Sequence, residues 1–240
     1  PGVPSKPDRA EPPPPSVPTV LFDLFDTLVS LRQPGRQAQQ EFADRLGLDL
    51  EAVRQWWKAK MRERLVGFYP TYSAIVEAMC KDLGSSASEE VRHQICKERD
   101  DDRTSTLQSV KPEVIGTLRQ LRQDGWRIGI LSNATPDEVA PWPNSPLSPL
   151  VDDTVFSCHV GCMKPEREIY DLACSRLDVT PPEPRFVGDG GFGELQAAAA
   201  LGMPVIKANW FRPRTIDWTS DVDLVEVDDI AQVPQLLQSL

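Results

Sequence analysis

Three short apolar segments of the sequence each end in polar side chains that could take part in chemistry. In chain order, these are 20–22 before Asp23, 126–131 before Ser132 and Asn133, and 185–187 before Gly188 and Asp189. Apolar runs of this length are typical of buried parallel strands. The carboxyl ends of parallel strands lie along one edge of an open α/β sheet, where such sheets bind ligands. We therefore expect these polar residues to converge on one site, with Asp23 as the reactive group.

The residue types at these strand ends favour nucleophilic catalysis by a carboxylate. Asp23 and Asp189 would repel each other unless a cation lay between them, and two carboxylates with a backbone carbonyl suit Mg²⁺. Ser132 and the amide of Asn133 can donate hydrogen bonds to phosphoryl oxygens. Lys164, before a proline and a helix, would pair with the carboxylate and offset charge on a transferred group. Together they predict an aspartyl-phosphate that forms on Asp23 and is hydrolysed by water.

The segments between these residues predict the framework that positions them. Strands are expected at 20–22, 126–131, 154–157, 185–187 and 205–206, and they alternate with helices at 113–123, 166–177, 194–201 and 230–240. Strands and helices that alternate with short turns predict an α/β fold with a Rossmann-like, doubly wound parallel sheet. We expect this core to comprise residues 19–31 and 108–240.

A separate helical unit is expected at residues 32–107, because no strand-like alternation interrupts 34–103. The apolar spacing predicts amphipathic helices at 37–46, 50–66, 72–83 and 88–99. The stripes of tryptophan, methionine and leucine on these helices are more typical of a packed core than of a cofactor site. The unit is therefore read as an insertion between the first and second strands of the sheet.

Residues 1–18 are rich in proline and carry no apolar pattern, which is typical of a polyproline-like or disordered arm or linker. The arm is read either as an inert tail or as a connection to a fused or partner protein. The chain begins at Pro1, which is compatible with a piece of a longer polypeptide.

Composition limits the classes of function. The 240 residues carry a formal net charge of -10, which argues against sequence-independent binding to nucleic acid or to an anionic membrane surface. A local cation or basic group can still bind a small phosphorylated molecule. The five scattered cysteines fit reduced thiols, and no apolar stretch approaches transmembrane length. We therefore expect a cytoplasmic protein that is not exported.

Four motifs in this order resemble those of the haloacid dehalogenase (HAD) superfamily of hydrolases. They are Phe22-Asp23-Leu24-Phe25-Asp26-Thr27-Leu28, Leu131-Ser132-Asn133, Lys164-Pro165, and Val187-Gly188-Asp189-Gly190-Gly191-Phe192-Gly193-Glu194. The resemblance covers nearly everything after Thr19, and the helical tract occupies the position of the family's type-1 cap. Four motifs with this order and spacing are a specific signal.

The resemblance implies a role for each matching residue. Asp23 would be the nucleophile, Ser132 would bind phosphate and Lys164 would be the orienting cation. Mg²⁺ would be held by Asp23, the backbone carbonyl of Phe25, Asp189 and Glu194. We expect Ser132, Asn133, Phe25 and Thr27 to line the substrate site, and the cap to close over it and exclude water.

One departure from the family pattern bears on the reaction. Family phosphatases carry a second aspartate two residues after the nucleophile as a general acid–base, and this chain has Phe25 there. Asp26 is one residue further on, where a glycine is usual, and a one-residue shift points a side chain the other way. Loss of a general acid–base typically costs about 10²- to 10⁴-fold in rate.

Phe25 keeps two other functions open beside a Mg²⁺-dependent phosphatase for small phosphomonoesters. Dehalogenases of the superfamily have an aromatic residue at this position and use neither that acid nor a metal, since halide leaves unprotonated. The second alternative is a catalytically weak domain that serves as a binding or scaffold unit. The first motif is therefore dehalogenase-like, while Gly188-Asp189 is phosphatase-like.

Gly188, Gly190 and Gly193 also match the glycine pattern of dinucleotide-binding sites. We do not expect such a site, because the carboxylate of Asp189 would face the negatively charged pyrophosphate.

Overall fold

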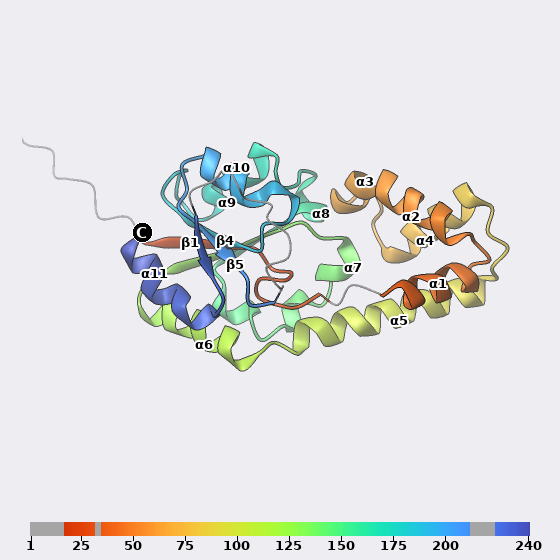
Figure 1. Ribbon diagram of the computed structural model, residues 1–240, viewed down its shortest axis with the longest axis horizontal. Helices are drawn as coiled ribbons and strands as arrows, with labels where there is room; N and C mark the ends of the chain where they lie inside the picture. The colour runs from red at the N-terminus through yellow and green to blue at the C-terminus, as the bar shows by residue number, and fades with distance from the viewer. Residues whose placement is uncertain (1–16, 32–34, 212–223) are drawn as a thin grey trace, which may run out of the picture.

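The computed structural model describes residues 17–31, 35–211 and 224–240, which Figure 1 shows as coloured ribbon. The predicted proline-rich arm, residues 1–18, lies outside the described residues except for its last two. A six-stranded parallel sheet forms one part of the molecule, and a group of helices forms the other (Figure 1).

The sheet has the strand order β3-β2-β1-β4-β5-β6, and every neighbouring pair is parallel. The strands are β1 (Thr19–Phe22), β2 (Arg127–Ser132), β3 (Asp153–Phe156), β4 (Arg185–Gly188), β5 (Val205–Ala208) and β6 (Val225–Val227). Phe22 pairs with Ile130 on one side and with Val187 on the other, so β1 is central. The carboxyl ends of β1, β2 and β4 therefore share one edge, which confirms the predicted Rossmann-like, doubly wound sheet.

Alternate residues of the strands supply two hydrophobic cores, one on each face of the sheet. Phe22, Val187 and Ile206 pack with α6 (Pro112–Gln123) and α11 (Val233–Ser239). Leu21, Phe186 and Val205 pack with α9 (Arg167–Arg176) and α10 (Glu194–Ala200). This layering follows from the two-residue period of a strand, because successive side chains point to opposite faces. Figure 1 shows α6 and α11 on one side of the strands and α9 and α10 on the other.

Five helices between β1 and β2 form the helical insert. They are α1 (Arg36–Arg45), α2 (Leu50–Ala59), α3 (Met61–Leu65), α4 (Tyr72–Leu83) and α5 (Glu89–Gln108). The insert has a hydrophobic cluster of its own, with Ile75, Val76 and Met79 fully buried. Side chains of Asp49, Thr71 and Ser88 cap α2, α4 and α5. The expected helix at 50–66 is divided at Lys60, and α5 continues nine residues beyond the expected end at 99 (108 − 99 = 9) to reach the core.

Polar contacts connect the helical insert to the core. Arg99 of α5 forms ion pairs at 2.8 Å with Asp137 and at 3.0 Å with Glu138 of α7 (Pro136–Val139). The Ser157 hydroxyl, at the start of α8 (Ser157–Val160), donates to the carbonyl oxygen of Leu65 at 2.6 Å. These bonds join the insert to the segments that follow β2 and β3, at the carboxyl edge of the sheet.

Several short elements were not expected from the sequence. The proline-rich segment 136–149, where no helix was expected, contains α7 and the 3₁₀ turns η1 (Trp142–Asn144) and η2 (Ser148–Leu150). Two further 3₁₀ turns are η3 (Gly191–Gly193) and η4 (Ile230–Gln232), so the helix expected at 230–240 is divided into η4 and α11. The expected strand at 154–157 ends at Phe156, where α8 begins, and β6 was not predicted.

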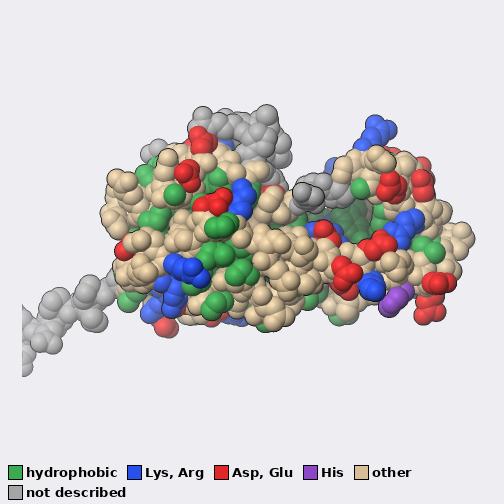
Figure 2. All heavy atoms as spheres, turned by 90° about the horizontal axis from the view of Figure 1, so that it is seen from below, with side chains coloured by type: hydrophobic (Ala, Val, Ile, Leu, Met, Phe, Trp, Pro, Cys, Tyr) green, Lys and Arg blue, Asp and Glu red, His purple; other side chains and the backbone are tan. Residues whose placement is uncertain are grey.

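The surface carries charges of both signs. On the face seen in Figure 2, acidic and basic side chains are interspersed over the helical insert. None of the helices in the described ranges combines the length and the apolar character that crossing a bilayer requires.

Candidate active site

The site is built around Asp23, the first residue after β1. The Asp23 amide donates to the carbonyl of Val187 at 2.9 Å, which extends the β1–β4 pairing by one residue and fixes the backbone. The side chain is 8% exposed. A carboxylate that is this buried needs a cation or hydrogen-bond donors to compensate its desolvation.

Lys164 supplies that cation. Its ammonium group lies 2.6 Å from Oδ1 of Asp23 and also bonds Oε2 of Glu194. The Asn133 side chain holds the Lys164 backbone from both sides, because its Nδ2 donates to the Lys164 carbonyl at 2.9 Å and its Oδ1 accepts from the Lys164 amide at 2.8 Å. The lysine side chain is 2% exposed. Lys164 is therefore fixed at the backbone by the loop after β2 and at its tip by two carboxylates.

Glu194 approaches the lysine from the first turn of α10. Its Oε1 accepts from the amide of Gly190 at 3.0 Å, while its Oε2 accepts from Lys164. Gly188 makes room for this carboxylate, because a Cβ on Gly188 would lie 2.2 Å from Oε1 of Glu194. Tyr170 donates to the backbone carbonyl of Glu194 at 2.9 Å. Glu194 therefore holds the ammonium of Lys164 directly, and its predicted part in binding a metal stays a prediction.

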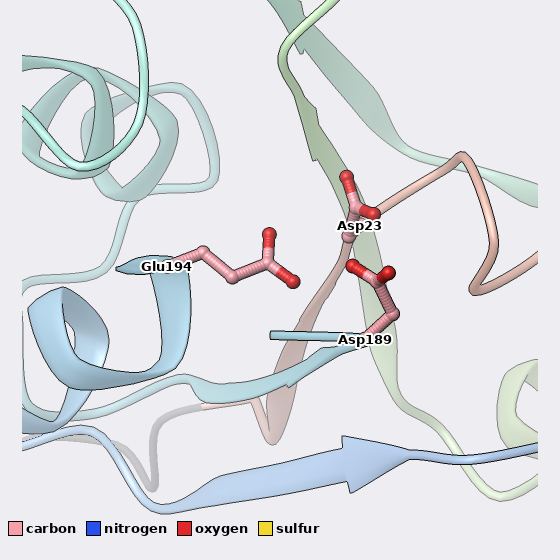
Figure 3. Close-up of side chains that lie close together, drawn as sticks. All are labelled: Asp23, Asp189 and Glu194. Atoms are coloured by element: carbon pink, nitrogen blue, oxygen red, sulfur yellow. The ribbon is translucent and has the colours of Figure 1, made fainter. Parts of the chain in front are cut away.

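Asp189 completes a cluster of three carboxylates. One oxygen from each of Asp23, Asp189 and Glu194 lies within 4.8 Å of the others. Figure 3 shows Asp189 pointing from the end of β4 towards Asp23, with Glu194 reaching in from α10. The single ammonium of Lys164 leaves a net negative charge in this group. Hard oxygen donors that carry excess negative charge fit Mg²⁺, so the donor set is compatible with the predicted metal.

Burial and crowding of charge shift the pKa values of the group towards proton binding. Burial raises the pKa of Asp23 above its ordinary value, and the neighbouring Asp189 adds to this, while Lys164 acts in the opposite direction. Burial likewise raises the pKa of Glu194 to about 8, against the opposing effect of Lys164. Burial alone would lower the pKa of Lys164, but the attraction of Asp23 and Glu194 raises it. One ammonium does not satisfy all the carboxylates, and the group favours an additional cation or proton.

Two buried hydroxyl groups, those of Thr27 and Ser132, belong to the segments at this edge of the sheet. The Thr27 hydroxyl donates to Oδ2 of Asp23 at 3.4 Å, so the two carboxylate oxygens are held from different sides. Ser132, at the end of β2, is 1% exposed, and its hydroxyl has no hydrogen-bond partner among the described residues. A buried hydroxyl without a partner is costly and usually has a reason. Its position next to β1 fits the predicted role in binding an anionic substrate group.

Phe25 and Asp26 occupy the loop that follows the nucleophile. Phe25 is 9% exposed and belongs to the hydrophobic cluster that contains Phe22 and Val187. Asp26 has a left-handed backbone with φ of 57°, and its Oδ1 accepts from the amide of Leu31 at 3.0 Å. This bond engages the Asp26 carboxylate in the turn of its own loop.

The structure brings Asp23, Lys164, Asp189, Glu194 and Thr27 together. Strand ends predicted the approach of Asp23 and Asp189, and the roles assigned to these residues stay predictions. Asn133 was expected to bind substrate, which stays a prediction, and its side chain bonds the Lys164 backbone. Sequence reasoning did not foresee the bond between Lys164 and Glu194. The signal for it was Gly188, whose missing side chain leaves the space that Glu194 fills.

A comparison with models of known protein families shows which family the chain belongs to. The model of the family described as haloacid dehalogenase-like hydrolase matches residues 17–202, which include all four motifs. The chain belongs to this family of hydrolases.

Relatives of this hydrolase include enzymes of two specificities. It is 24% identical over 230 residues to (S)-2-haloacid dehalogenase 1 of Pseudomonas sp. (strain CBS-3), covering 92% of this chain and 96% of that protein. It is 21% identical over 215 residues to a glyceraldehyde 3-phosphate phosphatase of Methanopyrus kandleri, covering 87% and 91%. A HAD family enzyme of Bacteroides thetaiotaomicron, solved in complex with magnesium and inorganic phosphate, superposes with a TM-score of 0.61 at 18% identity over 85% of this chain and 98% of its own. These likenesses support the hydrolase fold and leave the substrate to be argued from the site.

Proposed function

We propose that this HAD-like hydrolase is a Mg²⁺-dependent phosphatase that acts on a small phosphomonoester through an aspartyl-phosphate at Asp23. The observation that carries the proposal is the three-carboxylate cluster, in which one oxygen each of Asp23, Asp189 and Glu194 lies within 4.8 Å of the others. Metal-independent displacement of halide has no need of Asp189 beside the nucleophile. A phosphoryl dianion approaching the same carboxylate needs positive charge beyond that of Lys164.

When bound, Mg²⁺ would be held by Asp23, Asp189 and the backbone carbonyl of Phe25, and it would neutralise charge where a phosphoryl group meets the nucleophile. Glu194 is assigned to Lys164, whose ammonium its Oε2 contacts directly, while its Oε1 accepts from the amide of Gly190. The cation is assigned to Asp189, which lies beside the nucleophile and whose Oδ1 also accepts from the amide of Gly191 at 3.0 Å.

The protein's groups and solvent together account for each bond change in the proposed reaction. An oxygen of Asp23 attacks phosphorus while the bond from phosphorus to the leaving oxygen breaks. The leaving alkoxide takes its proton from solvent, because Phe25 supplies none. Water then attacks phosphorus, the bond between phosphorus and the Asp23 oxygen breaks, and inorganic phosphate leaves with the carboxylate restored. Lys164 holds the carboxylate in place throughout, and Ser132 would donate to a phosphoryl oxygen.

Phe25 favours a second candidate, haloacid dehalogenation without metal. Here an oxygen of Asp23 attacks the carbon that bears the halogen, halide leaves, and water attacks the carbonyl carbon of the resulting ester. The hydroxy acid leaves with the Asp23 oxygen that attacked the carbon, and the oxygen of the water takes its place in the carboxylate. The relative of Pseudomonas sp. named above is a dehalogenase, which supports testing this reaction beside the first.

The test is a parallel assay of phosphate release and halide release. Sugar, nucleotide and small-acid phosphates are screened with Mg²⁺ and with EDTA, and 2-haloacids are screened under the same two conditions. The phosphatase proposal predicts phosphate release that requires Mg²⁺ and disappears in Asp23→Asn. Halide release at the same rate with and without EDTA would show that the protein is a metal-independent haloacid dehalogenase. If a folded protein releases neither phosphate nor halide, a binding or scaffold domain is favoured and both proposals are overturned.

A further inference from the structure

We propose that Trp210 is a positioning residue that holds the nucleophile loop, residues 24–31, so that Thr27 can orient the Asp23 carboxylate. The inference rests on the proposed role of Asp23 as nucleophile. Trp210 lies outside all four motifs and follows β5, two residues beyond its last residue, Ala208. Its indole Nε1 donates to the backbone carbonyl of Thr27 at 2.7 Å, across 183 residues of sequence.

The nucleophile loop is a tight turn with a left-handed residue at its bend. Asp26 has φ of 57°, a conformation that costs a non-glycine residue free energy and that the surroundings must hold in place. Hydrogen bonds within the loop supply part of that support. The amides of Leu28 and Val29 donate to the Leu24 carbonyl, the Asp26 amide donates to the Val29 carbonyl, and the Leu31 amide donates to Oδ1 of Asp26.

Trp210 adds an anchor from outside the loop. The strand order places β4 between β1 and β5, so the indole reaches across the end of β4 to meet the loop that follows β1. Trp210 and Phe211 also pack against the hydrophobic cluster to which Leu24, Phe25 and Leu28 belong. The loop is thus fixed by a hydrogen bond at its bend and by apolar packing on its buried side.

This anchor bears on the nucleophile through one residue. The Thr27 carbonyl receives the Trp210 bond, and the Thr27 hydroxyl donates to Oδ2 of Asp23 at 3.4 Å. A distance of 3.4 Å is near the outer limit of a hydrogen bond, so a small shift of the loop would break it. Lys164 holds the other carboxylate oxygen at 2.6 Å. Trp210 therefore helps to set which way the carboxylate faces by acting through Thr27.

Amide hydrogen exchange measured by mass spectrometry tests the anchor whether or not a substrate is known. Trp210→Phe keeps an aromatic ring and removes the indole donor. We expect exchange in the peptide covering 24–31 to rise about two- to tenfold, the range for loss of one hydrogen bond. Trp126→Phe is the matched control, because Trp126 is a buried member of the same cluster at the start of β2. Unchanged exchange of 24–31 in Trp210→Phe, or an equal rise in Trp126→Phe, would overturn the proposal.

A double-mutant cycle then tests the route through Thr27. Thr27→Val removes the hydroxyl and keeps the carbonyl. If Trp210 acts through that hydroxyl, Trp210→Phe lowers kcat about two- to tenfold in the wild-type background with KM unchanged, and has little further effect in Thr27→Val. Additive effects on kcat, or a change confined to KM, would contradict the route. An inactive wild type would instead count against the proposed function, and the exchange experiment alone would then decide the role of Trp210.

Discussion

The ammonium of Lys164 lies 2.6 Å from Oδ1 of Asp23, although 141 residues separate the two in the sequence. Both side chains are buried, and the same ammonium bonds Glu194. Lys164, Asp23 and Glu194 therefore join three chain segments: the turn before α9, the end of β1 and the first turn of α10. The fold fixes the orientation of the nucleophile before substrate arrives, which is the form of preorganisation that electrostatic catalysis requires.

Replacing Ser132 should separate activity from stability. Its hydroxyl is buried without a partner among the described residues, so Ser132→Ala loses no protein hydrogen bond and should leave the free energy of unfolding unchanged or slightly raised. If the hydroxyl donates to an anionic substrate group, kcat/KM should fall about 10- to 100-fold, the value of one hydrogen bond to a charged group.

Ser157→Ala is the matched control for that variant. Ser157 is fully buried, and its hydroxyl bonds the Ala134 amide and the Leu65 carbonyl. Its removal should lower the free energy of unfolding by about 1–3 kcal/mol, measured in urea. A Ser132→Ala protein that loses stability and keeps full activity would contradict the assignment.

Supplying the missing acid should accelerate phosphate release. Phe25→Asp places a carboxyl group two residues after the nucleophile, where it can protonate the leaving oxygen, and the expected gain in kcat is at least about tenfold towards the 10²- to 10⁴-fold range of general acid–base catalysis. The variant should also lose stability, because Phe25 belongs to a hydrophobic cluster. Phe25→Asn controls for shape without the acid, and equal rates in the two variants would refute the explanation.

Glu194 should make the stability of the metal-free protein depend on pH. Burial raises its pKa in the folded state to about 8, above the ordinary value of 4.5. The folded state therefore binds this proton more tightly than the unfolded state does, and the stability contribution is fully present below pH 4.5 and is lost as the pH rises through about 8. Thermal unfolding in EDTA should show Tm falling over this window in the wild type.

Glu194→Gln removes the titrating group, so its Tm should be flatter with pH than that of the wild type over the same window. Mg²⁺ should likewise flatten the wild-type curve, because a cation in the carboxylate cluster opposes proton binding. A wild-type Tm that rises with pH while that of Glu194→Gln does not would show that the sign is wrong.

The junction between the helical insert and the core should be sensitive at Gly67. Its φ is +76°, and a Cβ there would lie 2.0 Å from the carbonyl oxygen of Cys158. Gly67→Ala should therefore cost more than the roughly 1 kcal/mol of a left-handed alanine. Gly84→Ala is the control, because Gly84 has φ of +71° with open space around its Cα. Chemical denaturation should find Gly67→Ala the less stable of the two, and equal losses would exclude a steric role.

The parts of the fold that the sequence predicted are those with a strong local pattern. The apolar runs 20–22, 126–131 and 185–187 predicted the strands, because a buried parallel strand is apolar along its length. The polar residues that follow these runs predicted the edge of the sheet that carries the site. The short β6 has no such run, since Val225–Val227 alternates around Glu226. The break between α2 and α3 at Lys60 also lacks glycine or proline and follows from packing that a local pattern does not carry.

The candidate site shows the same division. The chemical types of Asp23, Lys164 and Asp189 indicated a carboxylate centre before any geometry was known. The assignment of Glu194 to Lys164, and of Asn133 to the lysine backbone, depended on which neighbours fill space at the ends of β2 and β4. The bond from Trp210 to Thr27 could not be predicted from the sequence, because it depends on the order of strands in the sheet.

The most direct test of the central claim is mass spectrometry of the enzyme quenched in acid during turnover of a phosphomonoester with Mg²⁺. The account predicts that the peptide containing Asp23 gains the mass of one phosphoryl group, that fragmentation places it on Asp23, and that Asp23→Asn gains nothing. A substrate that is hydrolysed with no modification at Asp23, or with the phosphoryl group on another residue, would contradict the account.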